Sequence, residues 1–372
     1  MEERALREYI NSIESVDEKV KDKAKKRMDN LAKPPGSLGK LEDIAIQYAS
    51  ITGEVRNHIK KKGVIIFSGD NGVYEEGISP TPQSVTMTQT INFTRRITGV
   101  GALATANDTD LCIVDVGING DLPGNLAADE MYMFTQDKIV NRKIRKATSN
   151  LAKGPAMTKE EALTAIETGI EAVYTMKARD YDIIGVGEMG IGNTTTSAAV
   201  LKAITGCSSG QATGRGGGLS DNGLARKVEI VEKAASRCQG KPILDILAEV
   251  GGFDICAMVG AYLGAAKYKI PVVIDGYISA VAALAAWKMA PVSVEYMLAS
   301  HHSKEPGYKI AIEELGLRPM LDLNMRLGEG SGCVLAFDIV KGALGVMDYM
   351  ATLDEAKIAE DYLDLVKDAR FD

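Results

Sequence analysis

Four short apolar runs constrain the fold more strongly than any other feature of the sequence. They are residues 63–67 (GVIIF), 111–114 (LCIV), 182–186 (DIIGV) and 271–274 (PVVI), and each leads into Gly or Asp and then into a helix-length segment. Runs that are apolar on both faces are typical of buried parallel strands. Their repetition with intervening helices predicts an α/β domain with a mostly parallel sheet flanked by helices, of the Rossmann-like kind. The ligand of such a domain binds beyond the carboxyl ends of the strands.

The two ends of the chain show a helical pattern instead. Residues 1–33 are expected to be helical, with Ser15 and Glu18 as a capping box. The run KPPGSL at 33–38 ends that helix, because proline lacks the amide donor. After Ser331 apolar residues again recur at helical spacing. The sequence therefore predicts a small helical domain formed by residues 1–61 and 333–372, and a large α/β domain formed by residues 62–332.

Composition argues against several classes of function. The formal net charge is −7 and no basic block could follow a phosphate backbone, so a nucleic acid partner is not expected. The longest apolar stretch, residues 280–287, is far shorter than a membrane span, and the charged start of the chain lacks the apolar region of a signal peptide. The five cysteines, an odd number without a CxxC pair, favour a reducing compartment. We therefore expect a cytoplasmic protein that does not bind a membrane.

Metal binding is not expected either. The three histidines, His58, His301 and His302, are too few for a His-rich metal site, and we expect them at the surface or behind the functional residues.

The residues suited to chemistry lie in the loops that follow the predicted strands. The loop 68–86 is long and rich in Gly and Pro, and loops of this length in compact domains are more often functional. The loop 185–196 (GVGEMGIGNTTT) opens a helix, so its glycines and free amides favour an anion. A glycine loop at 210–218 precedes a helix that carries Lys227, and together they form a candidate phosphate clamp.

Two common nucleotide motifs are weak or missing. Gly185, Gly187 and Gly190 spell GxGxxG, but the acidic residue expected some 20 positions later is missing, since residues 206–210 read GCSSG. The sequence has no GxxxxGK[ST] phosphate loop. A dinucleotide-dependent oxidoreductase therefore remains only as an alternative.

Three further loops complete the set of candidate site segments: 275–277 (DGY), 300–307 (SHHSKEPG) and 326–332 (RLGEGSG). In the last of them Glu329 lies between two glycines. We expect these glycines to leave the carboxylate accessible and to let a flat ligand approach.

Motifs along nearly the whole chain resemble those of the nicotinate-nucleotide:dimethylbenzimidazole phosphoribosyltransferase family. They are KPPGSLGKLE (33–42), GDNGVYEEGIS (69–79), PQSVT (82–86), GEMGIGNTTTSAA (187–199), GLSDNGLARK (218–227), GGFDICAMVGA (251–261), IDGYISAVAALAA (274–286), SHHSKEPG (300–307) and LDLNMRLGEGSG (321–332). The resemblance implies an α/β large domain, a small helical domain from the termini and a homodimer. It also implies transfer of the phosphoribosyl group of nicotinate mononucleotide to 5,6-dimethylbenzimidazole or a related aromatic base, in cobamide nucleotide-loop synthesis.

The resemblance assigns roles to individual residues as well. Glu329 would be the general base and Glu188 its supporting carboxylate. The phosphate, ribose and nicotinate of the nucleotide would be held by Gly190, Ile191, Gly192, Asn193, Thr194, Gly216, Lys227, Gly276 and Ser303. The acceptor base would be lined by Ser79, Thr81, Gln89, Met189 and Leu327.

The chemistry of this reaction suits these residue types. Nicotinate leaves the ribose as a neutral ring and no pyrophosphate departs, so the usual need for Mg²⁺ is removed and we expect neither a metal nor a cofactor. The acceptor loses a proton as it attacks. A carboxylate within hydrogen-bond reach can take that proton, and exclusion from water raises the pKa of the carboxylate toward the working pH.

Three features depart from the family pattern and leave the identity of the acceptor open. Asn71 stands where a GDHGV form has His, Gly217 stands where GRGTG is usual, and residues 87–93 are more polar than expected beside a base pocket. Members that activate phenols share the resemblance, and some work as a pair of related subunits. A phenol- or cresol-activating subunit, a heterodimer of related subunits and a non-catalytic partner subunit therefore remain as alternatives.

Overall fold

A wholly parallel sheet of seven strands forms the centre of the protein, in a computed structural model that describes residues 1–358. The strand order is β3-β4-β2-β1-β5-β6-β7, and every neighbouring pair is parallel. The predicted α/β fold is confirmed. The four apolar runs form β1, β2, β5 and β6, whereas three very short strands were not predicted. The strands are β1 (Lys62–Gly69), β2 (Asp110–Gly117), β3 (Ala127–Ala128), β4 (Ile139–Asn141), β5 (Ile183–Met189), β6 (Val272–Ile274) and β7 (Met297–Ala299).

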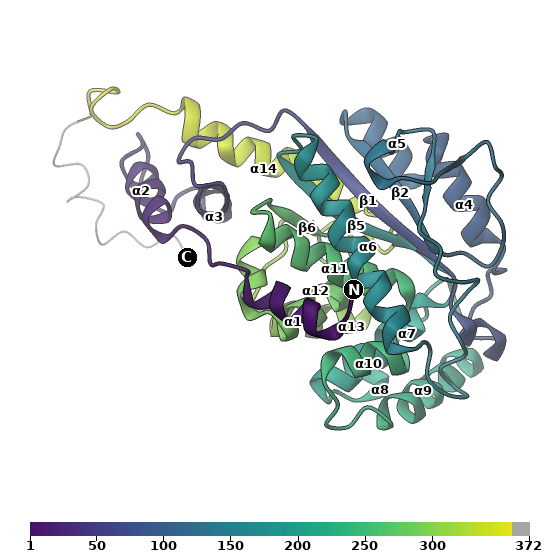
Figure 1. Ribbon diagram of the computed structural model, residues 1–372. Coiled ribbons are helices and arrows are strands. Elements are labelled where there is room, and N and C mark those ends of the chain that lie inside the picture. The colour runs from purple at the N-terminus through teal and green to yellow at the C-terminus, as the bar shows by residue number, and fades with distance from the viewer. Residues whose placement is uncertain (359–372) are drawn as a thin grey trace.

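Helices cover both faces of the sheet, which explains why its central strands are largely apolar (Figure 1). In β1, Ile65 and Phe67 belong to one core cluster, Val64 and Ile66 belong to the other, and all four side chains are fully buried. A strand covered on both sides has no solvent face on which polar residues would be favoured.

The first core cluster is built with helices α1 (Glu3–Asn11), α6 (Lys159–Ala178), α7 (Asn193–Thr205), α8 (Ser209–Ala212), α9 (Asp221–Ser236), α10 (Ile243–Val250), α11 (Phe253–Lys267), α12 (Tyr277–Met289) and α13 (Pro306–Glu314). The second is built with helices α2 (Glu18–Asp29), α3 (Lys40–Thr52), α4 (Val85–Thr94), α5 (Gly99–Ala106) and α14 (Ser331–Tyr349).

Helices α6 and α11 approach each other closely enough for backbone to touch backbone. A Cβ atom at Gly169 of α6 would collide with the carbonyl of Ala257, and one at Gly260 of α11 would collide with the carbonyl of Ile166. Glycine is therefore required at both positions, because any side chain would push the helices apart. This packing holds α11 against β1, β2 and β5 and brings its first turn to the end of β1 at Gly69.

Segments from both ends of the chain meet on the face covered by α14. Helix α3 packs on both α2 and α14, and Leu31 pairs with Thr352 in an isolated antiparallel bridge (Figure 1). Helix α14 also packs on β1, β5 and β6, so it belongs to the core of the sheet as well. The division into a small helical and a large α/β domain stays a prediction, and residues 359–372 lie outside the described part of the chain.

Residues 1–33 are largely helical, as expected, but the helix is interrupted at residues 12–17. This segment forms α1 and α2, which join different core clusters through Leu6 and Met28. The expected capping box at Ser15 is wrong. Asp17 precedes α2 and accepts a hydrogen bond from the Val20 amide over 3.0 Å, and its carboxylate is a stronger acceptor at a helix N-terminus than a hydroxyl.

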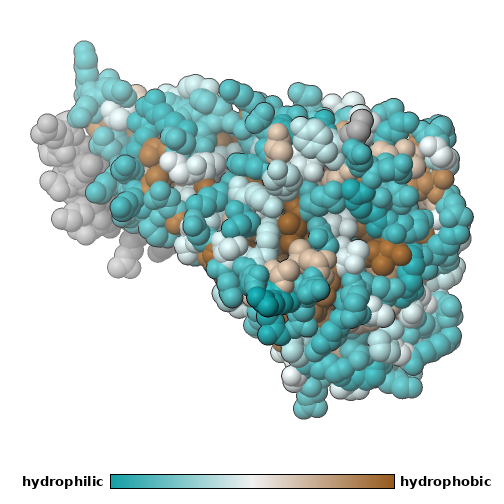
Figure 2. Space-filling model, viewed as in Figure 1, coloured by the Kyte–Doolittle hydropathy of each residue, from teal (hydrophilic) through white to brown (hydrophobic). Residues whose placement is uncertain are grey.

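None of the helices within residues 1–358 is both long and apolar enough to cross a bilayer. The face of the molecule shown in Figure 2 is mostly hydrophilic, and its apolar residues lie in small separate groups.

Candidate active site

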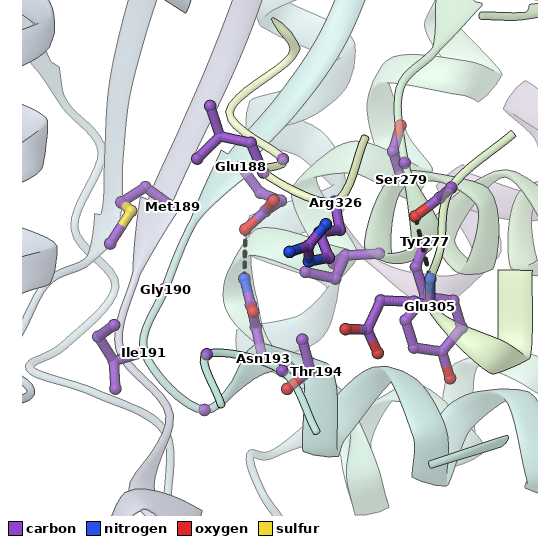
Figure 3. Close-up of a pocket in the computed structure, with 18 of the residues that line it drawn as sticks. Glu188, Met189, Gly190, Ile191, Asn193, Thr194, Tyr277, Ser279, Glu305 and Arg326 are labelled. Atoms are coloured by element: carbon purple, nitrogen blue, oxygen red, sulfur yellow. Dashed lines mark hydrogen bonds between the residues drawn. The ribbon is translucent and has the colours of Figure 1, made fainter. Parts of the chain in front are cut away.

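A pocket of about 290 Å³ opens at the carboxyl ends of the central strands (Figure 3). Its walls come from the loops that follow β1, β5, β6 and β7 and from the loop that precedes α14. Ligands of parallel α/β sheets bind at this edge. All of the predicted site residues line the pocket except Gln89, Lys227 and Glu329. Lining residues that were not predicted include Gly217, Tyr277, Ser279, His301, Glu305, Arg326 and Gly328.

The loop between β5 and α7 forms one wall of the pocket with its backbone. Gly192 has a left-handed φ of 97° and begins α7 without a side-chain cap. A Cβ atom at Gly190 would collide with the Gly69 carbonyl, so the loop lies directly against the end of β1. The Ile191 amide donates to Thr86 Oγ1 over 3.1 Å, which ties the loop to α4. An uncapped helix N-terminus with fixed amides suits a ligand that carries negative charge.

Lys227 lies behind this wall and is fully buried. Its Nζ donates to Thr194 Oγ1 over 2.8 Å and to the Gly214 carbonyl over 3.1 Å. Burial lowers the Lys227 pKa to about 8, and the negative charge of Glu305 opposes that shift. Glu305 itself lines the pocket, and burial raises its pKa. A buried ammonium group beside the pocket destabilises the folded protein unless a ligand pairs with its charge.

Glu188 occupies the end of β5 and is almost completely buried. Its carboxylate accepts a hydrogen bond from Asn193 Nδ2, at the start of α7 (Figure 3). Burial raises the Glu188 pKa to about 8, and the nearby carboxylates of Asp254, Asp275 and Glu329 raise it further. A carboxyl group with such a pKa can exchange a proton near neutral pH.

Glu329 is buried, which corrects the expectation of an accessible carboxylate. Only 4% of the residue is exposed, because Gln89 Nε2 donates to Oε1 over 2.8 Å and the Val100 amide donates to Oε2 over 3.1 Å. Its φ is 64°, a left-handed conformation that costs a non-glycine residue roughly 1–2 kcal/mol. The preceding Gly328 lines the pocket, and a Cβ atom there would collide with Glu188 Oε1. Glu188 therefore lies against the loop that carries Glu329.

Asp275 holds the Glu329 loop in place, a role that the sequence analysis missed. Its Oδ2 accepts from the Gly330 amide over 2.9 Å and its Oδ1 accepts from the Gly332 amide over 2.7 Å. Both amides belong to the start of α14, so Asp275 caps that helix from the end of β6. In the sequence, the only sign of this role of Asp275 was the motif DGY at the end of a predicted strand.

His301 lies in the pocket, which partly corrects what we expected of the histidines. His301 is buried, lines the pocket and contacts Ser300 Oγ through Nδ1 at 3.0 Å, whereas we expected it at the surface or behind the site. Burial lowers its pKa to about 4, so it is neutral at physiological pH. Because His301 and His302 are adjacent, the sequence alone does not show which of the two side chains faces inward.

The departures from the family pattern lie at or next to the pocket. Asn71 is fully buried against Gly190 and Gly252, and within residues 1–358 neither polar atom of its side chain has a hydrogen-bond partner. Gly217 lines the pocket, and a Cβ atom there would lie 3.4 Å from Thr81 Oγ1. A larger side chain at 217 would therefore narrow the pocket on the side of Thr81.

The fold and the pocket define an α/β enzyme that can hold an anionic ligand near Lys227 and accept a proton at a pair of buried carboxylates. In the described part of the chain, no group of three or more His, Cys, Asp or Glu side chains is placed to hold a metal ion.

Comparisons with known proteins agree with this class. A family model described as phosphoribosyltransferase matches residues 13–358. The nicotinate-nucleotide--dimethylbenzimidazole phosphoribosyltransferase of Clostridium perfringens (strain 13 / Type A) is 53% identical over 365 residues, or 98% of each chain. The protein of that name from Ruminiclostridium cellulolyticum is 48% identical over 357 residues, or 95% of this chain and 97% of the relative.

A solved structure agrees as well. The crystal structure of the enzyme of the same description from Thermus thermophilus is 39% identical, with a TM-score of 0.85, and the match covers 92% of this chain and 99% of that one. The chain belongs to this phosphoribosyltransferase family, and the family resemblance inferred from the motifs is confirmed.

Proposed function

We propose that the chain transfers the phosphoribosyl group of nicotinate mononucleotide to 5,6-dimethylbenzimidazole or a related aromatic base, in cobamide nucleotide-loop synthesis. The products are the α-riboside 5′-phosphate and nicotinate. The observation that carries the proposal is a pair of buried carboxylates at the Gly328 loop: Glu188, which lines the pocket and lies against Gly328, and Glu329, the residue that follows Gly328. Relatives named for this activity over nearly their full length support it.

The nucleotide phosphate is placed near Lys227 and the start of α7 in this proposal. The Lys227 ammonium carries three protons, and Thr194 and Gly214 take two of them. The third can form a charge-assisted hydrogen bond with a phosphate oxygen. The rest of the nucleotide would be held by Gly190, Ile191, Gly192, Asn193, Gly216, Gly276 and Ser303.

The acceptor base is placed at the Glu329 side of the pocket. Leu327 is 59% exposed and lines the pocket, so it offers an apolar surface that a flat ring would cover. Gln89 orients Glu329 through its 2.8 Å hydrogen bond. Ser79, Thr81 and Met189 complete the lining in this proposal.

In the proposed reaction, an acceptor ring nitrogen forms a bond to the anomeric carbon while the bond from that carbon to the pyridinium nitrogen breaks. The electron pair of the broken bond neutralises the pyridinium nitrogen, so nicotinate departs without a proton. The acceptor loses a ring N–H proton, which passes to Glu329. Positioning of the two rings about one carbon supplies much of the remaining acceleration.

We further infer that the protein acts in the cytoplasm and as a homodimer. The five cysteines are all unpaired, which suits a reducing compartment. The dimer follows from the family resemblance, with a heterodimer of related subunits as the alternative. Light scattering on the purified chain distinguishes a self-associated dimer from a monomer that needs a second gene product.

The test of the proposed activity is incubation of the chain with nicotinate mononucleotide and a panel of benzimidazoles, purines and phenols, with products identified by mass. We expect riboside phosphates of benzimidazole-type bases. Preferred transfer to phenols would favour the phenol-activating alternative, and NAD binding without transfer would favour the oxidoreductase. Absence of product with every acceptor would contradict the proposal.

A further inference from the structure

Three side chains from different elements meet at the wall of the pocket and form a carboxylate–amide–carboxylate bridge. Glu188 lies near the end of β5, Asn193 begins α7, and Asp254 lies in the first turn of α11. Asn193 Nδ2 donates both to Glu188 Oε2 and to Asp254 Oδ2, the latter over 3.0 Å. Figure 3 shows the first of these hydrogen bonds at the edge of the pocket.

The bridge fixes the orientation of the Asn193 amide. A primary amide nitrogen carries two hydrogens, and here each one faces a carboxylate oxygen. Rotation of the amide would place its carbonyl oxygen against the Asp254 carboxylate, which is repulsive. Asp254 therefore determines that Asn193 presents a donor to Glu188.

The Asn193 donor in turn determines how Glu188 is oriented. It engages Oε2, whereas Oε1 lies against Gly328, directly before Glu329. One oxygen of Glu188 is thus occupied by the bridge, and the other is directed toward the loop of the proposed base. A small displacement of either carboxylate would change the geometry at the acceptor.

The buried carboxylate of Asp254 is expected to destabilise the fold at this position. It is fully buried, and within residues 1–358 it forms no ion pair with Lys, Arg or His. A Cβ atom at Gly252 would collide with Asp254 Oδ1, so the local backbone is built to admit this carboxylate. Buried carboxylates without a cation are destabilising and are concentrated at functional sites.

We propose that Asp254 is a positioning residue for the transfer reaction, which orients Glu188 through Asn193 and adds negative charge beside it. The proposal rests on the proposed function for the meaning of its kinetic effects. Burial and the Asp254 charge both raise the Glu188 pKa, which is about 8. Removing the Asp254 charge removes a like charge, so the Glu188 pKa should fall.

Other carboxylates surround the bridge and raise the pKa of the carboxyl group that they face. Asp275 from the end of β6 and Glu329 from the loop before α14 face Glu188, while Asp70 from the loop after β1 faces Asp254. Arg326 is a cation that lines the same pocket. All of these remain in an Asp254 variant, so a lower Glu188 pKa there reports the loss of the Asp254 charge.

The test compares Asp254→Asn, Asn193→Ser and the double variant with the parent protein. The Glu188 pKa is followed by infrared difference spectroscopy, with Glu188→Gln to assign the band, so this readout needs no turnover. We expect a lower Glu188 pKa in Asp254→Asn, and a kcat reduced about 10- to 100-fold with little change in the KM for the nucleotide. The double variant should be no worse than the more impaired single variant, because Asp254 orients Glu188 through Asn193.

The control is Asp110→Asn. Asp110 starts β2, at the edge of the sheet away from the pocket, and accepts from the Tyr181 hydroxyl over 2.6 Å. It should affect the unfolding temperature without moving the Glu188 pKa. An unchanged Glu188 pKa in Asp254→Asn, or in Asn193→Ser if the first variant does not fold, would overturn the bridge. Lack of transfer by the parent protein would contradict the proposed function instead, and would leave the Glu188 titration as the test of the bridge.

Discussion

Lys227 provides the sharpest quantitative prediction, because the structure ties its charge to both binding and stability. Replacing it with Met removes one charge-assisted hydrogen bond to a phosphate, worth about 1.5–3 kcal/mol. At about 1.4 kcal/mol for each tenfold change, the dissociation constant for nicotinate mononucleotide should rise roughly 10- to 150-fold. Isothermal titration calorimetry measures this directly.

The pH dependence of nucleotide binding follows from the same group. Only the protonated amine attracts the phosphate, and the Lys227 pKa is lowered by burial to about 8. Affinity should therefore be nearly constant between about pH 7, where the phosphate is mostly a dianion, and pH 8. It should fall as the pH rises through 8, and Lys227→Met should lack this decline.

The stability of the free protein should depend on pH in the opposite sense to the nucleotide affinity. The Lys227 pKa in the folded state lies below its value of 10.5 in a model compound, so between about pH 8 and 10.5 the unfolded chain binds more protons. The free energy of unfolding should rise with pH across that window. The lowered pKa of Lys227 corresponds to a destabilisation of roughly 3 kcal/mol by its charged form. Substitution with Met removes this destabilisation, and the gain offsets the cost of about 1–3 kcal/mol for leaving the Gly214 carbonyl unpaired. Lys227→Met should therefore unfold at a temperature no lower than the parent protein.

Lys233→Met is the control, because Lys233 lies on the same helix but is exposed. It should leave nucleotide affinity and its pH dependence unchanged. The reasoning is refuted if Lys227→Met binds the nucleotide as tightly as the parent protein, or if it keeps the decline above pH 8.

Three further outcomes are expected. Glu329→Gln should lower kcat about 10²–10⁴-fold with nucleotide affinity nearly unchanged, and an intact kcat would point to Glu188 as the base. Activity should survive EDTA, because the leaving group is neutral, and a loss of turnover that a divalent ion restores would contradict the mechanism. Gly217→Thr should narrow the pocket beside Thr81 and shift the preference among acceptors in competition assays while sparing nucleotide affinity, and unchanged product ratios would place the acceptor elsewhere.

The sequence predicted the parts of the fold that depend on local pattern. The apolar runs located β1, β2, β5 and β6 because a strand buried on both faces must be apolar throughout. Strands of two or three residues, such as Ala127–Ala128, carry no pattern that separates them from a loop. The Ser15 capping box failed because several polar residues near a helix start compete, and packing decides among them.

The candidate site was predicted for its loops but not for its internal contacts. The glycines around Glu329 suggested access, yet Gln89 and the Val100 amide bury its carboxylate. Those contacts join residues more than 200 positions apart, and a single sequence does not show which distant residues come together. Asp254 was missed for the same reason, since only the fold shows that Asn193 joins it to Glu188.

The place of α14 in the chain has a consequence for biosynthesis. This helix closes one face of the sheet, begins two residues after Glu329, and is followed by Thr352, which pairs with Leu31. A ribosome delivers the segments around Lys227 and Asn193 long before it delivers this helix. The core and the Glu188–Glu329 pair are therefore completed in the same step, so that a chain still lacking α14 has neither a finished fold nor Glu329, the proposed base.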